Sequence, residues 1–267
     1  MPRYFIEVSY KGTAYSGFQV QKNADSVQAQ TEKALFIYFK QHFSLTGASR
    51  TDTGVHALQN YFHFDTEQSL QKQNRPAGIA TGISPQENFD KTGILYSLNS
   101  ILPRDIVIKR IFLVAPNDHC RFDAVLRAYK YFIYGSKDPF LEDRAFYYPY
   151  RLDVSKLQAA AQLILKYKDF STFSKRNTQV KNFICEIKTS EWLQENKTLI
   201  YHVESNRFLR GMVKGLTGTM LRVGTGKLSL DQFEQIIKSK DCTKADFSVP
   251  PHGLFLIKVE YDHRANF

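Results

Sequence analysis

Residues 47–57 read GASRTDTGVHA, a polar turn that we expect to join two strands. The segment brings Arg50, Asp52 and His56 close together in sequence. Asp followed by glycine two positions later is common turn chemistry, so one interpretation is a plain Asx-turn with a solvated arginine. The functional interpretation is a lone carboxylate held beside a guanidinium that binds phosphate. Such a carboxylate can attack the anomeric carbon of a sugar, or remove a neighbouring proton, without a metal or cofactor.

Hydrophobic patterns of strands and helices extend outward from this turn in both directions. In the first half we expect strands at residues 4–9, 43–46, 60–64 and 106–114 and helices at 26–40 and 94–102. In the second half we expect strands at 128–134, 184–191, 198–204 and 253–261 and helices at 153–168, 211–223 and 229–239. Because strands and helices mix without strict βαβ alternation, the pattern predicts an α+β fold with largely antiparallel sheets.

Local signals fix several element ends. Ser26, Asp153 and Ser229 are the expected N-caps, and Ser229 forms a capping box with Gln232. Residues 66–92 are polar with scattered Gly and Pro, which predicts a long surface insertion to which the sequence assigns no role.

Length and composition set the class of protein. The chain has 267 residues, about 1.8 times a typical ~150-residue domain, which permits one large or two small domains. Its longest apolar runs fall far short of the ~20 residues that span a bilayer. The N-terminus reads as a strand without a signal-peptide core, and three widely separated cysteines fit reduced thiols. We therefore expect a cytoplasmic protein with no membrane segment.

The charge points to polyanionic partners. The formal net charge is +10, and the excess is spread over both halves of the chain rather than held in a tail. A spread excess is typical of a folded basic surface that binds polyanions, although it also describes a merely soluble basic protein. Many aromatic residues stand beside basic ones, as in RAYKYFIYG from Arg127 to Gly135. Aromatic rings stack on splayed RNA bases while Lys and Arg hold phosphates, so the composition favours RNA.

The segment at 47–57 closely resembles the signature of the tRNA pseudouridine synthase A family. Further blocks resemble that family in the same order, from about residue 3 to residue 262. They are TAYSGFQVQ, SVQAQTEKAL, SLNSILPRDI, CRFDAVLRAYKYFIYG, NRFLRGMVKGLTGTMLRVGTGKLS and PPHGLFLIKVEY.

This resemblance implies a fold and an activity. The fold would be two ferredoxin-like halves, here residues 1–115 and 116–267, with a central active-site cleft. The activity would be isomerisation of uridines 38 to 40 in the tRNA anticodon stem-loop to pseudouridine, without cofactor or metal. The enzyme would break the bond from C1′ to N1, turn the uracil and rejoin it through C5. The family binds tRNA across a homodimer.

The resemblance also assigns roles to individual residues. Asp52 matches the catalytic aspartate, and Arg50 matches the arginine thought to help displace the target base. Tyr129 matches the ring that stacks on the uracil. Lys214 stands where the family usually has an arginine that pairs with the aspartate. Lysine keeps the positive charge but cannot form the two parallel hydrogen bonds that a guanidinium makes to a carboxylate.

Two other functions stay open. One is a non-catalytic RNA-binding protein on the same scaffold, although a carboxylate would repel phosphates there. The other is an RNA N-glycosidase, which would need a positioned water and a proton donor for the leaving base.

Metal and thiol chemistry find little support in the sequence. His56 and His63 lie apart without a nearby thiolate, so they make a weak zinc site. His119 and Cys120 are adjacent, and on a strand they would point to opposite faces. We therefore expect no metal site and no thiol enzyme.

Overall fold

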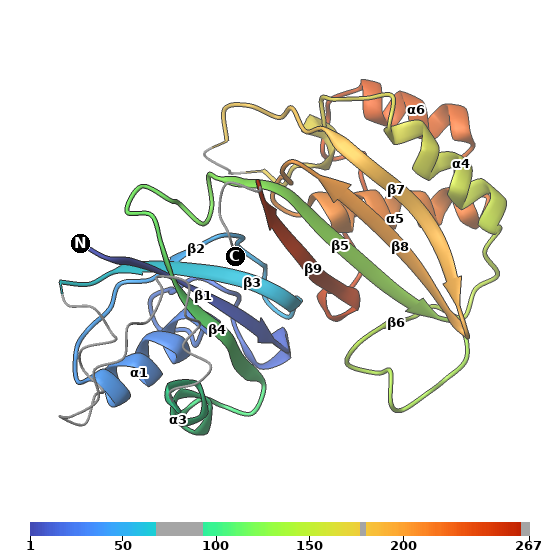
Figure 1. Cartoon of the computed structure of the whole chain (residues 1–267). Coiled ribbons are helices and arrows are strands. Elements are labelled where there is room, and N and C mark those ends of the chain that lie inside the picture. The colour runs from blue at the N-terminus through green and yellow to red at the C-terminus, as the bar shows by residue number, and fades with distance from the viewer. Residues whose placement is uncertain (68–92, 177–179, 263–267) are drawn as a thin grey trace. The chain divides into compact units, whose positions relative to one another are not determined.

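The computed structural model describes residues 1–67, 93–176 and 180–262, and the chain divides into two compact units (Figure 1). Unit 1 comprises Met1–Ala124 and Val259–Phe267, and unit 2 comprises Val125–Lys258. The predicted insertion at 66–92 lies outside the described residues, apart from Thr66 and Glu67. The expected division into functional halves after residue 115 stays a prediction.

Unit 1 is built on an antiparallel sheet in which β1 pairs with β3 on one side and β4 on the other. Its elements are β1 (Arg3–Tyr10), η1 (Gly12–Ala14), α1 (Val27–Phe39), β2 (Thr46–Gly47), β3 (His56–Asp65), α3 (Ile94–Ile101) and β4 (Ile106–Val114). Helices α1 and α3 pack together on one side of the sheet (Figure 1). Strand β2 pairs antiparallel with β3 and leads into the turn that carries Asp52.

Both faces of β1 are covered. Tyr4, Phe5 and Ile6 are at most 1% exposed, although successive strand residues point to opposite faces. Further along the chain, the ring of Phe18 stacks on Phe62 of β3 with centroids 4.4 Å apart. A Cβ at Gly47 would lie 2.3 Å from the Phe18 ring, so this close approach requires glycine. The first residue of the 47–57 segment is therefore fixed by packing.

The described part of unit 2 combines paired strands with the helices α4, α5 and α6. Its elements are β5 (Ala124–Tyr134), β6 (Phe146–Tyr147), α4 (Val154–Ile164), η3 (Ser171–Phe173), β7 (Ile187–Glu195), β8 (Thr198–Ser205), α5 (Met212–Gly224), α6 (Leu230–Lys238), η4 (Pro251–Gly253) and β9 (Leu254–Tyr261). Strand β8 pairs antiparallel with β5 and β7, and β9 lies next to β5. The two-residue strand β6 runs parallel to β5. The last residues of β9, from Val259, belong to unit 1.

The predicted fold class is confirmed as a mixed α and β chain with largely antiparallel pairing. The predicted N-caps are also confirmed. Ser26 accepts a hydrogen bond from the Ala29 amide, Asp153 accepts one from Lys156, and Ser229 forms the full capping box with Gln232. No helix in the described part of the chain has both the length and the apolar character needed to cross a bilayer.

Some predicted bounds were wrong. Strand β3 starts at His56 rather than at residue 60, because the preceding turn closes tightly and pairing resumes at once. The expected strand at 43–46 is displaced to Thr46–Gly47. Helix α4 ends at Ile164 rather than 168, where the next amides bond three residues back instead of four.

Candidate active site

The segment between β2 and β3 is anchored by buried polar groups. The fully buried Asn60 donates from Nδ2 to the Ser49 carbonyl at 2.9 Å. The Thr51 carbonyl accepts from the Phe18 amide at 3.1 Å, and the Thr51 hydroxyl bonds the Tyr10 hydroxyl at 2.8 Å. Buried hydrogen bonds of this kind hold a backbone in a single conformation. The residues directly before Asp52 therefore cannot shift without breaking several contacts.

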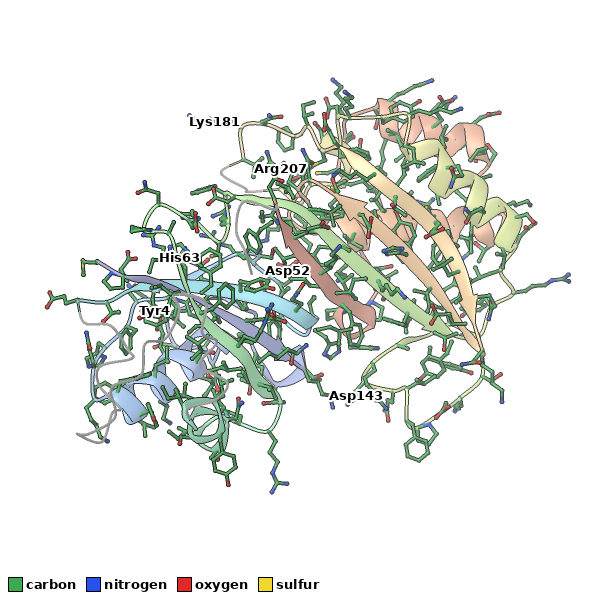
Figure 2. All side chains as sticks on the ribbon, viewed as in Figure 1. Tyr4, Asp52, His63, Asp143, Lys181 and Arg207 are labelled. Carbon is green, nitrogen blue, oxygen red and sulfur yellow. The ribbon has the colours of Figure 1, made fainter. Side chains whose placement is uncertain are left out.

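Asp52 lies at the start of a tight turn and is half-buried (Figure 2). Its carbonyl accepts a hydrogen bond from the Val55 amide at 3.1 Å, and Gly54 takes a φ of 76°, which favours glycine. The main chain therefore closes this turn.

His56 has a structural position at the end of the same segment. It is 1% exposed, and its Nδ1 atom accepts from the Gly12 amide at 3.0 Å. This bond ties the start of β3 to the loop after β1. Arg50, by contrast, is exposed at the surface of unit 1. The segment thus presents one arginine to solvent and keeps its histidine inside.

The other two candidate residues belong to unit 2. Tyr129 lies on β5 opposite Val203 of β8, is 8% exposed, and packs edge-on against the Phe208 ring at 5.0 Å. Lys214 lies in the first turn of α5 and is half-buried. Asp52 and Arg50 both lie in unit 1, two positions apart in the sequence. Their meeting with Tyr129 and Lys214 stays a prediction.

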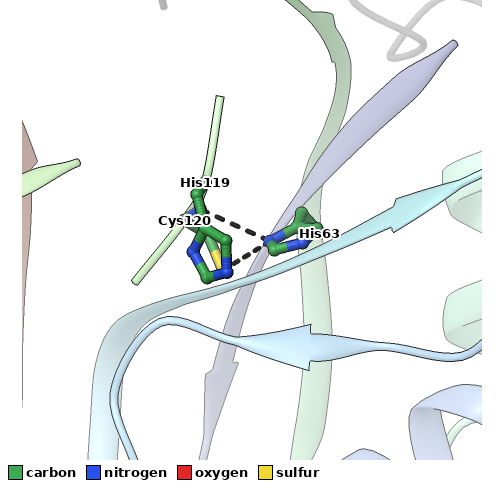
Figure 3. Close-up of side chains that lie close together, drawn as sticks. All are labelled: His63, His119 and Cys120. Carbon is green, nitrogen blue, oxygen red and sulfur yellow. Dashed lines mark hydrogen bonds between the residues drawn. The ribbon is translucent and has the colours of Figure 1, made fainter. Parts of the chain in front are cut away.

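A cluster of His63, His119 and Cys120 lies elsewhere in unit 1 (Figure 3), and the sequence did not reveal it. His119 and Cys120 are in the turn after β4, so the expectation that they occupy a strand was wrong. Cys120 is fully buried, and its Sγ lies 3.1 Å from Nδ1 of His63. Burial, with help from the charges of His119 and Arg3, lowers the pKa of His63 to about 4.

The protonation pattern of His119 bears on whether this cluster suits a metal. Nδ1 of His119 accepts from the Arg121 amide at 3.1 Å and from the Phe122 amide at 3.4 Å, so the neutral ring carries its proton on Nε2. A metal-bound imidazole instead donates its second N–H to an acceptor. The observed arrangement therefore favours an anchor for the turn over a metal site.

The fold and the site together define a basic α+β protein that presents one carboxylate and one exposed arginine on a rigid turn. A family model described as tRNA pseudouridine synthase matches residues 160–262. A protein of Parabacteroides distasonis named tRNA pseudouridine synthase A is 40% identical over 261 residues, covering 98% of this chain and 96% of its own. Its namesake in Bacteroides fragilis is 40% identical over 260 residues, covering 97% and 96%.

More distant relatives extend this similarity. A protein of Staphylococcus aureus with the same name is 32% identical over 262 residues, covering 97% of this chain and 91% of its own. These alignments span the 47–57 segment as well as the later blocks. The chain belongs to the tRNA pseudouridine synthase A family.

Proposed function

We propose that this protein isomerises uridine to pseudouridine in tRNA, at uridines 38 to 40 of the anticodon stem-loop. The observation that carries the proposal is the position of Asp52. Its carboxylate stands on a turn that the main chain closes and that buried Asn60 and Thr51 anchor on one side. A rigid support of this kind is what positions a reacting group.

In this reaction Asp52 is the nucleophile at C1′ of the ribose or the base that removes the 2′ proton. The C1′–N1 bond breaks, the uracil turns, and a new bond forms between C1′ and C5. The proton on C5 is then lost and N1 gains one, so product and substrate have the same atoms. Neither step requires an oxidant, a metal or a cofactor.

The remaining residues prepare the base for this step. Arg50, which is exposed beside Asp52 in sequence, helps to displace the target base from its stack. Tyr129 covers the extruded uracil with its ring, which replaces part of the stacking energy that the base loses. Lys214 supplies a positive charge opposite the Asp52 carboxylate. These roles require the two units to form two ferredoxin-like halves around one cleft.

The charge of the protein supports a tRNA substrate, and we place the reaction in the cytoplasm. The net charge of +10 is spread along the chain, which fits a surface that contacts phosphates over a long RNA stem. A homodimer would present two such surfaces related by symmetry. A non-catalytic RNA-binding protein is the alternative, but it has no use for a carboxylate on a rigid turn.

The test is incubation with unmodified tRNA transcripts followed by carbodiimide mapping of pseudouridine. We expect new signals at positions 38 to 40 and none in reactions with Asp52→Asn. Release of free uracil by the wild-type protein would instead indicate an N-glycosidase. RNA binding with no change in any base would indicate the non-catalytic alternative.

A further inference from the structure

Unit 1 holds an aromatic ring in solvent beside two other planar groups. Phe122 lies in the turn after β4 and is 73% exposed. One neighbour is the His119 ring, with centroids 4.2 Å apart, and the other is Arg121, whose Cζ lies 5.7 Å from the Phe122 centroid. A large apolar side chain kept at the surface next to a guanidinium is typical of a surface for base stacking.

The turn that carries Phe122 is held firmly from below. Buried Cys120 donates from Sγ to the Thr46 carbonyl at 3.1 Å and faces Nδ1 of His63 at the same distance. The Cys120 carbonyl accepts from the Tyr261 hydroxyl at 2.7 Å. The cluster that resembled a metal site therefore fixes this turn to β2, β3 and β9.

The neighbours of Phe122 are fixed as well. The His119 amide donates to Asp123 Oδ2 at 2.6 Å, and the Phe122 amide donates to the His119 carbonyl at 3.1 Å. The His119 ring also packs edge-on against His63, with centroids 4.5 Å apart. An exposed ring on an anchored turn loses little conformational entropy when a ligand stacks on it.

A hollow of about 230 Å³ opens beside this ring. It is smaller than the ~300–1,000 Å³ of pockets for drug-sized ligands, so it suits one flat group rather than an enclosed molecule. Arg50 and Arg121 contribute to its wall together with Phe122 and His119, and the exposed residues Gln19 and Thr46 add polar groups. The described residues that line the hollow include two guanidinium groups and no carboxylate.

We infer that this hollow is a subsite for a second unstacked nucleotide of the RNA substrate, distinct from the target uridine. The base stacks on Phe122, and the phosphate binds Arg121. Arg50 lines this subsite and lies two positions before Asp52 in the sequence, so the nucleotide flanks the target. The inference rests on the proposed function, because it takes RNA as the substrate and Asp52 as the reacting group.

The first test measures binding without turnover. In an Asp52→Asn background, Phe122→Ala and Phe122→Tyr are compared by fluorescence anisotropy with a labelled anticodon stem-loop. Loss of one stacked base weakens binding roughly 5- to 150-fold, whereas tyrosine keeps the stacking face. The matched control is Tyr96→Ala, which removes a ring that is 80% exposed on α3 of the same unit. Binding by Phe122→Ala within twofold of Tyr96→Ala overturns the subsite.

The second test identifies the nucleotide. A series of stem-loops carries one abasic residue at each loop position in turn, and each is measured with and without Phe122→Ala. At the stacked position, the losses of binding free energy from the abasic residue and from Phe122→Ala are not additive, because both changes remove the same contact. Additive losses at every position contradict the proposal. If Arg121→Gln weakens RNA binding and Phe122→Ala does not, the hollow provides only a phosphate contact. That result also overturns the stacking subsite.

A third measurement separates this inference from the proposed function. With Asp52 intact, Phe122→Ala should raise KM for tRNA by the same roughly 5- to 150-fold expected for binding. Saturating RNA should still give pseudouridine at positions 38 to 40. If the wild-type protein makes no pseudouridine, the proposed function fails, and the binding tests still decide whether a nucleotide stacks on Phe122. Unchanged melting temperatures for both alanine variants confirm that the folds are intact.

Discussion

At the scale of single residues, Asp52 carries the proposed chemistry, and its turn makes a clean substitution feasible. Asp52→Asn should abolish detectable pseudouridine and leave tRNA affinity unchanged or slightly higher, since one negative charge is removed. The turn should survive, because the Val55 amide bonds the main-chain carbonyl of residue 52 rather than its side chain. Carbodiimide mapping and anisotropy measure the two effects. Turnover near that of the wild type would exclude Asp52 as the reacting group.

Tyr129 offers a graded test of stacking. Tyr129→Phe keeps the ring and should retain activity, whereas Tyr129→Leu should lose most turnover with little loss of affinity for the duplex stem. Stacking on the uracil accounts for this difference, at about 1–3 kcal/mol per base. The leucine variant also loses the edge-on contact with Phe208, so thermal unfolding must be measured alongside activity. Equal turnover by Leu and wild type would show that the ring only packs.

Lys214 is the position at which this chain departs from the family pattern. Lys214→Ala should cut turnover severely if the ammonium faces the Asp52 carboxylate, because removing one member of a partly desolvated pair leaves the other uncompensated. Lys214→Arg should keep substantial activity, and Lys214→Met separates the charge from the aliphatic stem. If all three variants turned over like the wild type, the lysine would have no role in the reaction.

At the scale of elements, local sequence signals predicted most of the fold. Caps and hydrophobic period placed α1, α6, β4 and the β7–β8 hairpin within a few residues, because short-range chemistry determines those ends. The start of β3 was missed because His56 is polar, and its bond to the distant Gly12 amide, which helps it to lie buried in a strand, could not be predicted. The length of α4 was overestimated for a related reason, since its apolar period continues past the last regular hydrogen bond.

In the candidate site, too, only residues that are close in sequence could be predicted to act together. Asp52 and Arg50 could be singled out because they share one short segment. The cluster below Phe122 could not, because His63 and Cys120 are 57 positions apart and meet only through the sheet. No sequence pattern reports that the Cys120 thiol faces a histidine, nor that the next turn holds Phe122 in solvent.

This anchored turn leads to a prediction about pH. The pKa of His63 is lowered to about 4 in the folded protein, mainly by burial, whereas an unfolded histidine titrates near pH 6.5. Protonation therefore favours the unfolded chain, so the stabilising contribution is present above about pH 6.5 and is lost as the pH falls towards 4. Urea titrations between pH 7 and 4 should show that the free energy of unfolding falls more steeply with decreasing pH for the wild type than for His63→Phe. Parallel profiles would contradict this assignment.

At the scale of the whole molecule, the basic surface predicts how tRNA binding responds to salt. A log–log plot of affinity against salt concentration should fall steeply, with a slope of roughly −0.7 to −0.9 for each phosphate that the protein contacts. Arg121→Gln should reduce the slope by about one such contact, since it removes one guanidinium from the hollow. A slope near zero would show that the net charge of +10 is not directed at the RNA, and a steep slope unchanged in the variant would show that Arg121 contacts no phosphate.

The binding unit is the last expectation at this scale. We expect a two-fold symmetric dimer, in which one copy binds the anticodon stem while the partner contacts another part of the tRNA. Light scattering at micromolar concentration should therefore give about twice the 30.8 kDa mass of the chain. The complex should contain two copies of the protein for each tRNA or pair of tRNAs. A monomeric mass that persists with tRNA bound would contradict the dimer and would require one copy to make all the phosphate contacts that the salt slope counts.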